Sequence, residues 1–534
     1  MKSTKKLLSI SNLKKYFPVA KTSLFQKEQL YVRANEDVSL DIYEGETIGV
    51  VGESGCGKST LGRVLLQLYP QTAGTTMYYG STLADTAPAY VEDTLKNLGK
   101  YKSALQKAIA KSAEMDKKVA EAGDSADFYL LQEQNLAHCE EQTRRDHIVK
   151  ILGGFFAADE AKGVELLLKE YAANVKRRKA REAYIAAKLD YDQNLEEAGS
   201  DDKAKGKTAA LKAKMDAAEK ELEACKSACD QVLAQLDVLR ASHAAEPEFS
   251  KYEAMRDDGI DLSRLKYNEM RIFRKDLQII FQDPYSSLNP RMTIGQIIEE
   301  GLLTHNFFKH GSDKMRQHIV RTMEECGLQE YMLHRYPHQF SGGQRQRVAI
   351  ARALAVQPKF IVCDECVSAL DVSIQSQIIN LLQELRDRQN LTYMFISHDL
   401  SVVRYISDRI CVMYLGNVVE LGDSETIFND PRHPYTVALL SSIPTTDPES
   451  LKKERILLEG NIPSPIKPPT GCKFHTRCYM ACDKCKTVPP ALTEIEPGHF
   501  LACHFPEKKL DQDGNYLFEM PKMMSVARDT VGND

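Results

Sequence analysis

One segment of the sequence has the residue spacing of a phosphate-binding loop. It reads Gly52-Glu53-Ser54-Gly55-Cys56-Gly57-Lys58-Ser59 and is followed by Thr60. Glycines allow consecutive backbone N–H groups to converge on phosphate oxygens, and a helix that begins near Ser59 adds the positive end of its dipole. Lys58 supplies a full charge for the β- and γ-phosphates, and the Ser59 hydroxyl suits Mg²⁺. The segment therefore predicts a site for a nucleotide with Mg²⁺.

A second segment places two carboxylates at the end of a short apolar strand, Phe360-Ile361-Val362-Cys363-Asp364-Glu365. Asp364 is suited to hold Mg²⁺, directly or through water, and Glu365 to orient or deprotonate the water that attacks the γ-phosphate. The simpler interpretation is an acidic strand end that faces solvent. Because a phosphate loop precedes this strand in the sequence, ATP hydrolysis is the better prediction.

A third segment, Phe340-Ser341-Gly342-Gly343-Gln344, resembles the signature loop of ATP-binding-cassette (ABC) ATPases, with Phe340 where the family usually has Leu. Two glycines ahead of a helix beginning near Gln344 again present backbone donors to an anion. The resemblance implies an α/β fold, the ABC-type P-loop NTPase cassette. It also implies that Ser341, Gly342, Gly343 and Gln344 contact the γ-phosphate of ATP bound to the opposite subunit of a pair.

Other residues match further motifs of this family, and their roles follow from the resemblance. Gln282 matches the Q-loop glutamine, which touches Mg²⁺ or water, and His398 matches the switch histidine, which contacts the γ-phosphate. Phe17, or else Tyr16, is the candidate aromatic for stacking on adenine. Cys366 follows Glu365 where the family usually has Pro, which we expect to alter stiffness and not chemistry.

Three more segments resemble the oligopeptide/dipeptide importer branch; they are Tyr285–Met292, His433–Thr436 and Pro463–Pro465 leading to Gly471-Cys472. A fourth, Ser368–Gln375, is similar to the F-type subunit of that branch. The resemblance implies ATP-driven uptake of peptides. It also implies the partners: a D-type ABC ATPase subunit as the other half of a heterodimer, two transmembrane permease subunits and an extracytoplasmic peptide-binding protein. A non-peptide substrate such as a nickel chelate stays open.

Cysteines gather near the C-terminus. Cys472, Cys478, Cys485 and Cys503 match the C-terminal cysteine pattern of this branch, in some members of which a [4Fe–4S] cluster is thought to bind. Thiolates spaced this widely suit an iron–sulfur cluster better than a zinc knuckle. The tight pair Cys482 and Cys485 keeps zinc open, and buried free thiols are the third alternative.

The elements that must position these residues divide the chain into four parts. We expect the ABC ATPase core at 1–82 and 256–445, a helical insertion at 83–255, and an importer-type C-terminal region with the cysteines at 446–534. The insertion is expected to form one or two antiparallel hairpins, the longer projecting from the body. Its last helix carries a heptad typical of a coiled coil: Leu211, Met215, Ala218, Leu222, Cys225, Cys229, Val232, Leu236 and Leu239.

A helical insertion also suggests an alternative function, that of a DNA-acting ABC ATPase with a coiled coil. In those proteins the Q-loop precedes the coiled coil, whereas Gln282 follows the insertion here. A ribosome-associated ABC factor is disfavoured because only one phosphate loop and one signature occur in the sequence. The insertion itself is either a solvated spacer or a docking arm for a partner protein.

Composition fits a cytosolic protein attached to the membrane through its partners. The 534 residues carry a net charge of −5, which gives no general attraction to nucleic acid. No apolar run approaches the roughly 20 residues of a membrane helix, and the N-terminus lacks a secretion signal. The 13 cysteines are then expected to be reduced or metal-bound. We expect a peripheral protein on the cytoplasmic face of a bacterial plasma membrane.

Overall fold

The computed structural model describes residues 5–21, 29–123, 128–197, 202–443, 456, 458 and 460–505. Its larger sheet has eight strands in the order β11-β12-β10-β9-β3-β8-β7-β6. They are β3 (Thr47–Val51), β6 (Leu277–Ile280), β7 (Phe360–Asp364), β8 (Thr392–Ile396), β9 (Arg409–Tyr414), β10 (Asn417–Asp423), β11 (Thr493–Glu496) and β12 (His499–Leu501). From β6 to β9 the neighbours are parallel, so their carboxyl ends meet at one edge.

The smaller sheet is antiparallel, with the order β2-β1-β4-β5. Its strands are β1 (Lys6–Pro18), β2 (Tyr31–Tyr43), β4 (Ala73–Tyr78) and β5 (Ile260–Asp261). Strand β2 is one continuous strand of 13 residues. Its pairing with β1 contains register shifts, and Asp37 within it has a positive φ of 51°. One buried core lies between the two sheets.

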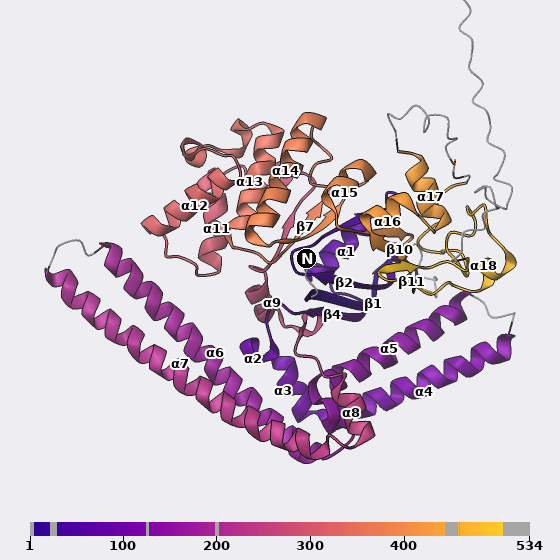
Figure 1. The fold of residues 1–534 in the computed structure, drawn as a ribbon, viewed down its shortest axis with the longest axis horizontal. Helices are drawn as coiled ribbons and strands as arrows, with labels where there is room; N and C mark the ends of the chain where they lie inside the picture. Colours follow the sequence, from indigo (N-terminus) through magenta and orange to yellow (C-terminus); the bar gives the residue numbers. More distant parts are fainter. Residues whose placement is uncertain are drawn as a thin grey trace, which may run out of the picture.

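Helices complete the ATPase core and the C-terminal region (Figure 1). They are α1 (Lys58–Leu65), α9 (Tyr267–Phe273), α10 (Pro284–Ser287), α11 (Ile294–Thr304), α12 (Asp313–Glu325), α13 (Gly342–Ala355), α14 (Val372–Gln389), α15 (Leu400–Ile406), α16 (Ser424–Asn429), α17 (Pro434–Ser441) and α18 (Asp483–Thr487). Helices α11 and α12 both pack on α13. Their apolar faces join β6 and β7 in a second core, which includes Ile298, Met323 and Ile350. This core ties the helical group to the strands that carry the carboxylates.

The insertion forms two antiparallel hairpins, α4 with α5 and α6 with α7, which extend in opposite directions below the core (Figure 1). Its helices are α2 (Leu83–Thr86), α3 (Ala89–Lys96), α4 (Leu98–Ala122), α5 (Phe128–Leu152), α6 (Glu160–Glu197), α7 (Asp202–His243) and α8 (Pro247–Glu253). All nine heptad positions of α7 are buried or half-buried, Cys229 and Leu236 most completely. The helical period thus selects the face of α7 that packs on α6.

The insertion leaves the smaller sheet intact. It enters after β4 and leaves before β5, and these strands pair directly, Met77 with Asp261 and Tyr78 with Ile260. The longer hairpin also returns to the core, where Asp190 of α6 pairs with Lys309 in the segment between α11 and α12. The longer hairpin was expected to project from the body, and the ion pair between Asp190 and Lys309 shows that it also contacts the core.

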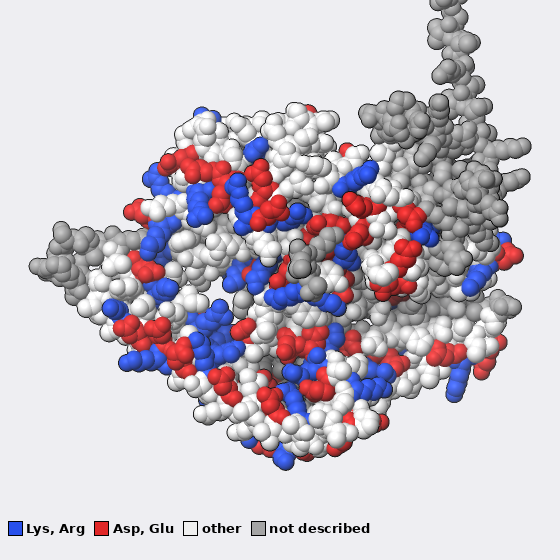
Figure 2. All heavy atoms as spheres, in the orientation of Figure 1, with Lys and Arg blue, Asp and Glu red and all other residues white. Residues whose placement is uncertain are grey.

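Charged side chains of both signs are mixed over the face shown in Figure 2, on the hairpins and on the core alike. Within the insertion many of them pair along one helix at a spacing of four residues, as Lys118 does with Glu114 and Lys169 with Glu165. Among the described residues, none of the helices combines the length and the apolar character that crossing a bilayer requires.

Candidate nucleotide site

The predicted phosphate loop connects the carboxyl end of β3 to the start of α1. All five residues of β3 are buried, which fixes the strand from which the loop emerges. Gly52 and Gly57 have φ angles of 148° and 101°. A Cβ would lie 2.2 Å from the Met413 carbonyl oxygen at Gly52 and 2.0 Å from that of Ala34 at Gly57. These two positions therefore require glycine both for their φ and for their space.

Lys58 and Ser59 lie at the start of α1 with their functional groups already oriented. The Lys58 side chain is buried, and its Nζ donates to the carbonyl oxygens of Gly52 at 2.8 Å and Glu53 at 3.1 Å. The Ser59 hydroxyl donates to Oδ1 of Asp364 at 2.5 Å. An ammonium group, a helix N-terminus, a hydroxyl and a buried carboxylate thus converge, which is the donor set that a nucleotide with Mg²⁺ requires.

Three polar side chains meet at the edge where the parallel strands end. Gln282 follows β6, Glu365 follows β7 and His398 follows β8. Nε2 of Gln282 donates to Oε2 of Glu365 at 2.8 Å, and Nδ1 of His398 lies 3.7 Å from the same oxygen. Glu365 has a φ of 49°, a left-handed conformation that is uncommon for a residue with a side chain and often found at functional sites. The sheet thereby gathers residues from three distant segments.

The predicted signature forms the N-terminus of α13, which begins at Gly342, two residues earlier than expected. Ser341 caps the helix, because its hydroxyl accepts from the N–H of Gln344 at 3.4 Å while Oε1 of Gln344 accepts from the N–H of Ser341 at 3.1 Å. Ser341 and Gly342 are exposed. Within the described parts of the chain, no hydrogen bond or ion pair joins 341–344 to 52–60, so the two loops are separate in one subunit.

The candidate adenine-stacking residues lie side by side on β1 with different surroundings. The ring of Phe17 packs edge-on against Tyr69, with centroids 5.4 Å apart, and Nζ of Lys15 lies 4.6 Å from the Phe17 centroid. The Tyr16 hydroxyl donates to Glu36 at 2.6 Å. Burial, together with the Glu36 charge, raises the pKa of Tyr16. The assignment of either ring to adenine stays a prediction.

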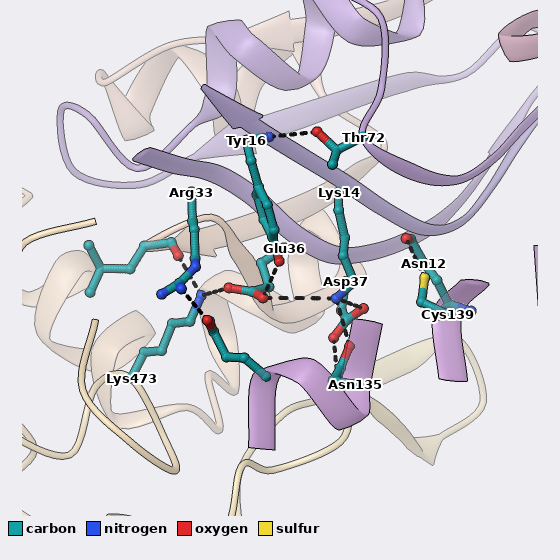
Figure 3. Close-up of polar contacts among 12 residues, drawn as sticks. Asn12, Lys14, Tyr16, Arg33, Glu36, Asp37, Thr72, Asn135, Cys139 and Lys473 are labelled. Atoms are coloured by element: carbon teal, nitrogen blue, oxygen red, sulfur yellow. Dashed lines mark hydrogen bonds and ion pairs between the residues drawn. The ribbon is translucent and has the colours of Figure 1, made fainter. Parts of the chain in front are cut away.

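A buried ionic network that the sequence did not reveal borders the loop (Figure 3). Glu36 of β2 lies between Nζ of Lys473, at 3.1 Å, and Nζ of Lys14, at 3.9 Å. Lys14 also contacts Asp37 at 2.6 Å and Asn135 of the insertion at 2.7 Å. Lysines and acids in strands carry no motif, and no alternation with apolar residues marks the inward positions, since Leu13, Lys14 and Lys15 are all buried in succession.

This network adjoins the phosphate loop through the backbone. The N–H of Glu36 donates to the Gly416 carbonyl at 2.8 Å, and the N–H of Gly416 donates to the Cys56 carbonyl at 3.0 Å. The Asn35 amide donates to the Gly57 carbonyl at 3.1 Å. Strand β2, the insertion and the C-terminal region therefore meet directly behind the loop.

The predicted cysteine ligands are brought together. Cys472, Cys478, Cys485 and Cys503 all line one small pocket, which His433, His475 and His504 also border. Burial raises the pKa of Cys472, that of Cys478 to about 12 and that of Cys503 to about 11. Among the described residues, no trio of His, Cys, Asp or Glu is arranged to hold a metal ion. Cys225 and Cys229 lie instead on the packed face of α7.

Comparison with known proteins places this site in a family. The family model described as ABC transporter matches residues 35–154 and 249–368. The model described as Oligopeptide/dipeptide transporter, C-terminal region, matches residues 419–485. A solved structure, the post-hydrolysis dimer of the ATP-binding cassette MJ0796 bound to ADP and Pi, is 17% identical with a TM-score of 0.40, over 78% of this chain and 99% of that one.

Curated relatives resemble this chain over nearly half of its length. The putative oligopeptide transport ATP-binding protein YkfD of Bacillus subtilis is 54% identical over 248 residues, which are 46% of this chain and 75% of that protein. The oligopeptide transport ATP-binding protein OppF of Escherichia coli is 52% identical over 246 residues, 46% of this chain and 73% of OppF. The chain therefore belongs to the ATP-binding proteins of ABC transporters, in the oligopeptide/dipeptide transporter family.

Proposed function

We propose that this chain hydrolyses ATP to power the uptake of peptides and that it forms half of a paired ATPase. The observation that carries the proposal is the convergence of Gln282, Glu365 and His398 at the strand edge beside Lys58 and Ser59. The match of the C-terminal region to oligopeptide/dipeptide transporters supports peptides as the cargo. The division of the chain into 1–82, 83–255, 256–445 and 446–534 is part of the same proposal.

Each residue has a distinct part in the reaction. Lys58 and the loop amides bind the phosphates, while Ser59 and Asp364, with Gln282, hold Mg²⁺, which neutralises phosphate charge when bound. Glu365 takes a proton from the attacking water, and Gln282 keeps its carboxylate oriented through the 2.8 Å hydrogen bond. His398, which lies near the same Glu365 oxygen as Gln282 does, donates a hydrogen bond toward the γ-phosphate.

The second half of the site comes from another subunit. Exposed Ser341 and Gly342 present the N-terminus of α13 to an anion outside their own subunit. Two cassettes that pair head to tail bring each signature to the other's phosphate loop. We propose a D-type ATPase as partner, two permease subunits, an extracytoplasmic peptide-binding protein, and a place on the cytoplasmic face of the bacterial plasma membrane.

A reconstitution experiment tests the function. The chain, its partner ATPase and the permeases are placed in vesicles with the peptide-binding protein, and ATP-dependent accumulation of a labelled oligopeptide is measured. Accumulation that requires ATP is the expected result. Transport of a nickel chelate without peptide would contradict the cargo, and ATPase activity stimulated by DNA without transport would favour the DNA-acting alternative. The position of the insertion, ahead of Gln282 and between paired strands, disfavours that alternative.

We also propose that α6 and α7 pair as a coiled coil, which their extensive packing supports.

We propose further that Cys472, Cys478, Cys485 and Cys503 ligate a [4Fe–4S] cluster. The pocket that these four residues share supports the ligand set. Because the thiol pKa values are raised, binding must release protons, so affinity rises with pH.

Metal analysis of anaerobically purified protein tests the cluster. We expect about four iron atoms per chain and a visible absorbance shoulder, both lost on Cys478→Ser. Cys225→Ser, on the packed face of α7, is the matched control and should keep the iron. Zinc in place of iron, or neither metal, would contradict the proposal.

A further inference from the structure

Glu53 of the phosphate loop is held by residues outside the loop. The Arg477 guanidinium donates two hydrogen bonds to its carboxylate, at 2.8 Å and 3.0 Å. This pair is well enclosed, since the Arg477 side chain is 6% exposed and that of Glu53 23%. The backbone N–H of Glu53 donates to the Tyr435 hydroxyl at 2.8 Å. Both the side chain and the backbone of Glu53 are therefore fixed from the C-terminal part of the chain.

An aromatic cluster fixes Arg477 in turn. Phe474 is buried and packs on Tyr414 and Tyr435, with centroid distances of 5.2 Å and 5.4 Å. The N–H of Arg477 donates to the Phe474 carbonyl at 3.0 Å, and its guanidinium lies 3.5 Å from the Tyr414 hydroxyl. The hydrogen bonds with Glu53 outweigh burial and raise the pKa of Arg477, so it stays charged. Arg477 is thus a rigidly placed cation directed at the loop.

The chemistry of the loop explains why such a cation matters. The carbonyl of Glu53 accepts from Nζ of Lys58, so Glu53 belongs to the part of the loop that binds phosphates. An unpaired carboxylate there repels a polyanionic ligand, whereas a bidentate guanidinium neutralises the charge and fixes its direction. Arg477, which lies 424 positions further along the chain, neutralises the Glu53 carboxylate and so allows a phosphate to bind beside it.

We propose that Arg477 is a positioning residue of the nucleotide site. It neutralises Glu53 and holds the loop in its phosphate-binding form, so the C-terminal region takes a direct part in ATP binding. The inference rests on the proposed function, because it assumes that ATP binds at this loop.

Affinity for MgATP, measured by calorimetry on the full chain, tests the inference. Arg477→Gln leaves Glu53 unpaired and should weaken binding about tenfold, which corresponds to about 1.4 kcal/mol. The double variant, Arg477→Gln with Glu53→Gln, lacks the carboxylate that repels the phosphates. Its affinity for MgATP should return to within about threefold of wild type. Arg477→Lys keeps the charge and should lose little. In the ATPase reaction KM should rise in Arg477→Gln while kcat at saturating ATP changes little.

If Arg477 only held the loop in place and had no electrostatic role, the double variant would bind MgATP no better than Arg477→Gln. That result, or wild-type affinity in Arg477→Gln, would overturn the inference. The matched control is Arg432→Gln, since Arg432 also pairs with carboxylates in this region, those of Asp430 and Glu496. Its affinity should not change. If the wild-type chain itself fails to bind MgATP, the proposed function fails and not the role of Arg477.

Discussion

Glu365→Gln should abolish ATP turnover while ATP still binds. The substitution keeps the shape of the side chain and its contact with Gln282 but removes the group that accepts a proton from water. Loss of a general base costs about 10²–10⁴ in rate. With hydrolysis blocked, the closed ATP-bound pair should accumulate, because hydrolysis is what reopens it. Steady-state phosphate release and gel filtration with the partner ATPase measure the two effects.

A surface carboxylate provides the control for this experiment. Glu384→Gln changes the same chemical group on α14. The Glu384 side chain is exposed, and its carboxylate forms a surface ion pair with Arg388 at 3.6 Å, with a spacing of four residues. It should turn over ATP like the wild type. If Glu365→Gln also kept wild-type turnover, Glu365 would not be the base, and the assignment of the strand edge as the catalytic site would be wrong.

Glu36→Gln should lower the free energy of unfolding by about 3 kcal/mol at pH 7, the cost of breaking a buried ion pair. The loss is large because Lys14 and Lys473 then face one another without the carboxylate between them. Burial alone would raise the pKa of Glu36. The charges of Lys473 and Lys14 and the hydrogen bond from Tyr16 outweigh burial and lower it to about 2. Urea unfolding of both chains measures the difference.

The same substitution should change the pH dependence of stability. The pKa of Glu36 is lower in the folded chain than in the unfolded chain, so its stabilisation is complete above about pH 4.5 and is lost as pH falls toward 2. The difference between wild type and Glu36→Gln should therefore shrink below pH 4.5. Glu44→Gln, at a surface pair with Lys5, should cost under about 1 kcal/mol at every pH. An equal loss in both variants would contradict a special role for Glu36.

Local sequence predicted the nucleotide motifs because their physics is local. A strand, a glycine loop and a helix must be contiguous to cradle a phosphate, so 47–65 could be assigned without any partner. The heptad of α7 was also predicted from local sequence, because the spacing of its apolar residues identifies the face of the helix that packs. In these segments, the residues that interact are neighbours in the chain.

Tertiary structure decided what joins these parts. Gln282 and His398 were predicted by resemblance, and Glu365 from its place at the end of an apolar strand. Only the parallel sheet brings Gln282 and His398 to one carboxylate oxygen of Glu365. Contacts such as those of Glu36 with Lys473 and of Asp190 with Lys309 join segments with no shared pattern, because a charge pair needs proximity and not a spacing in sequence.

The sequence by itself therefore determined which transporter family the chain belongs to, and it predicted that the loop from Gly52 to Ser59 binds the phosphates of ATP. It contained no sign that the loop depends on the C-terminal region. Glu53 and Arg477 are partners in the fold in which Phe474, three residues before Arg477, packs against Tyr414. Buried side chains pack in the positions that the whole fold imposes, and the placement of Arg477 against the loop is a property of that packing.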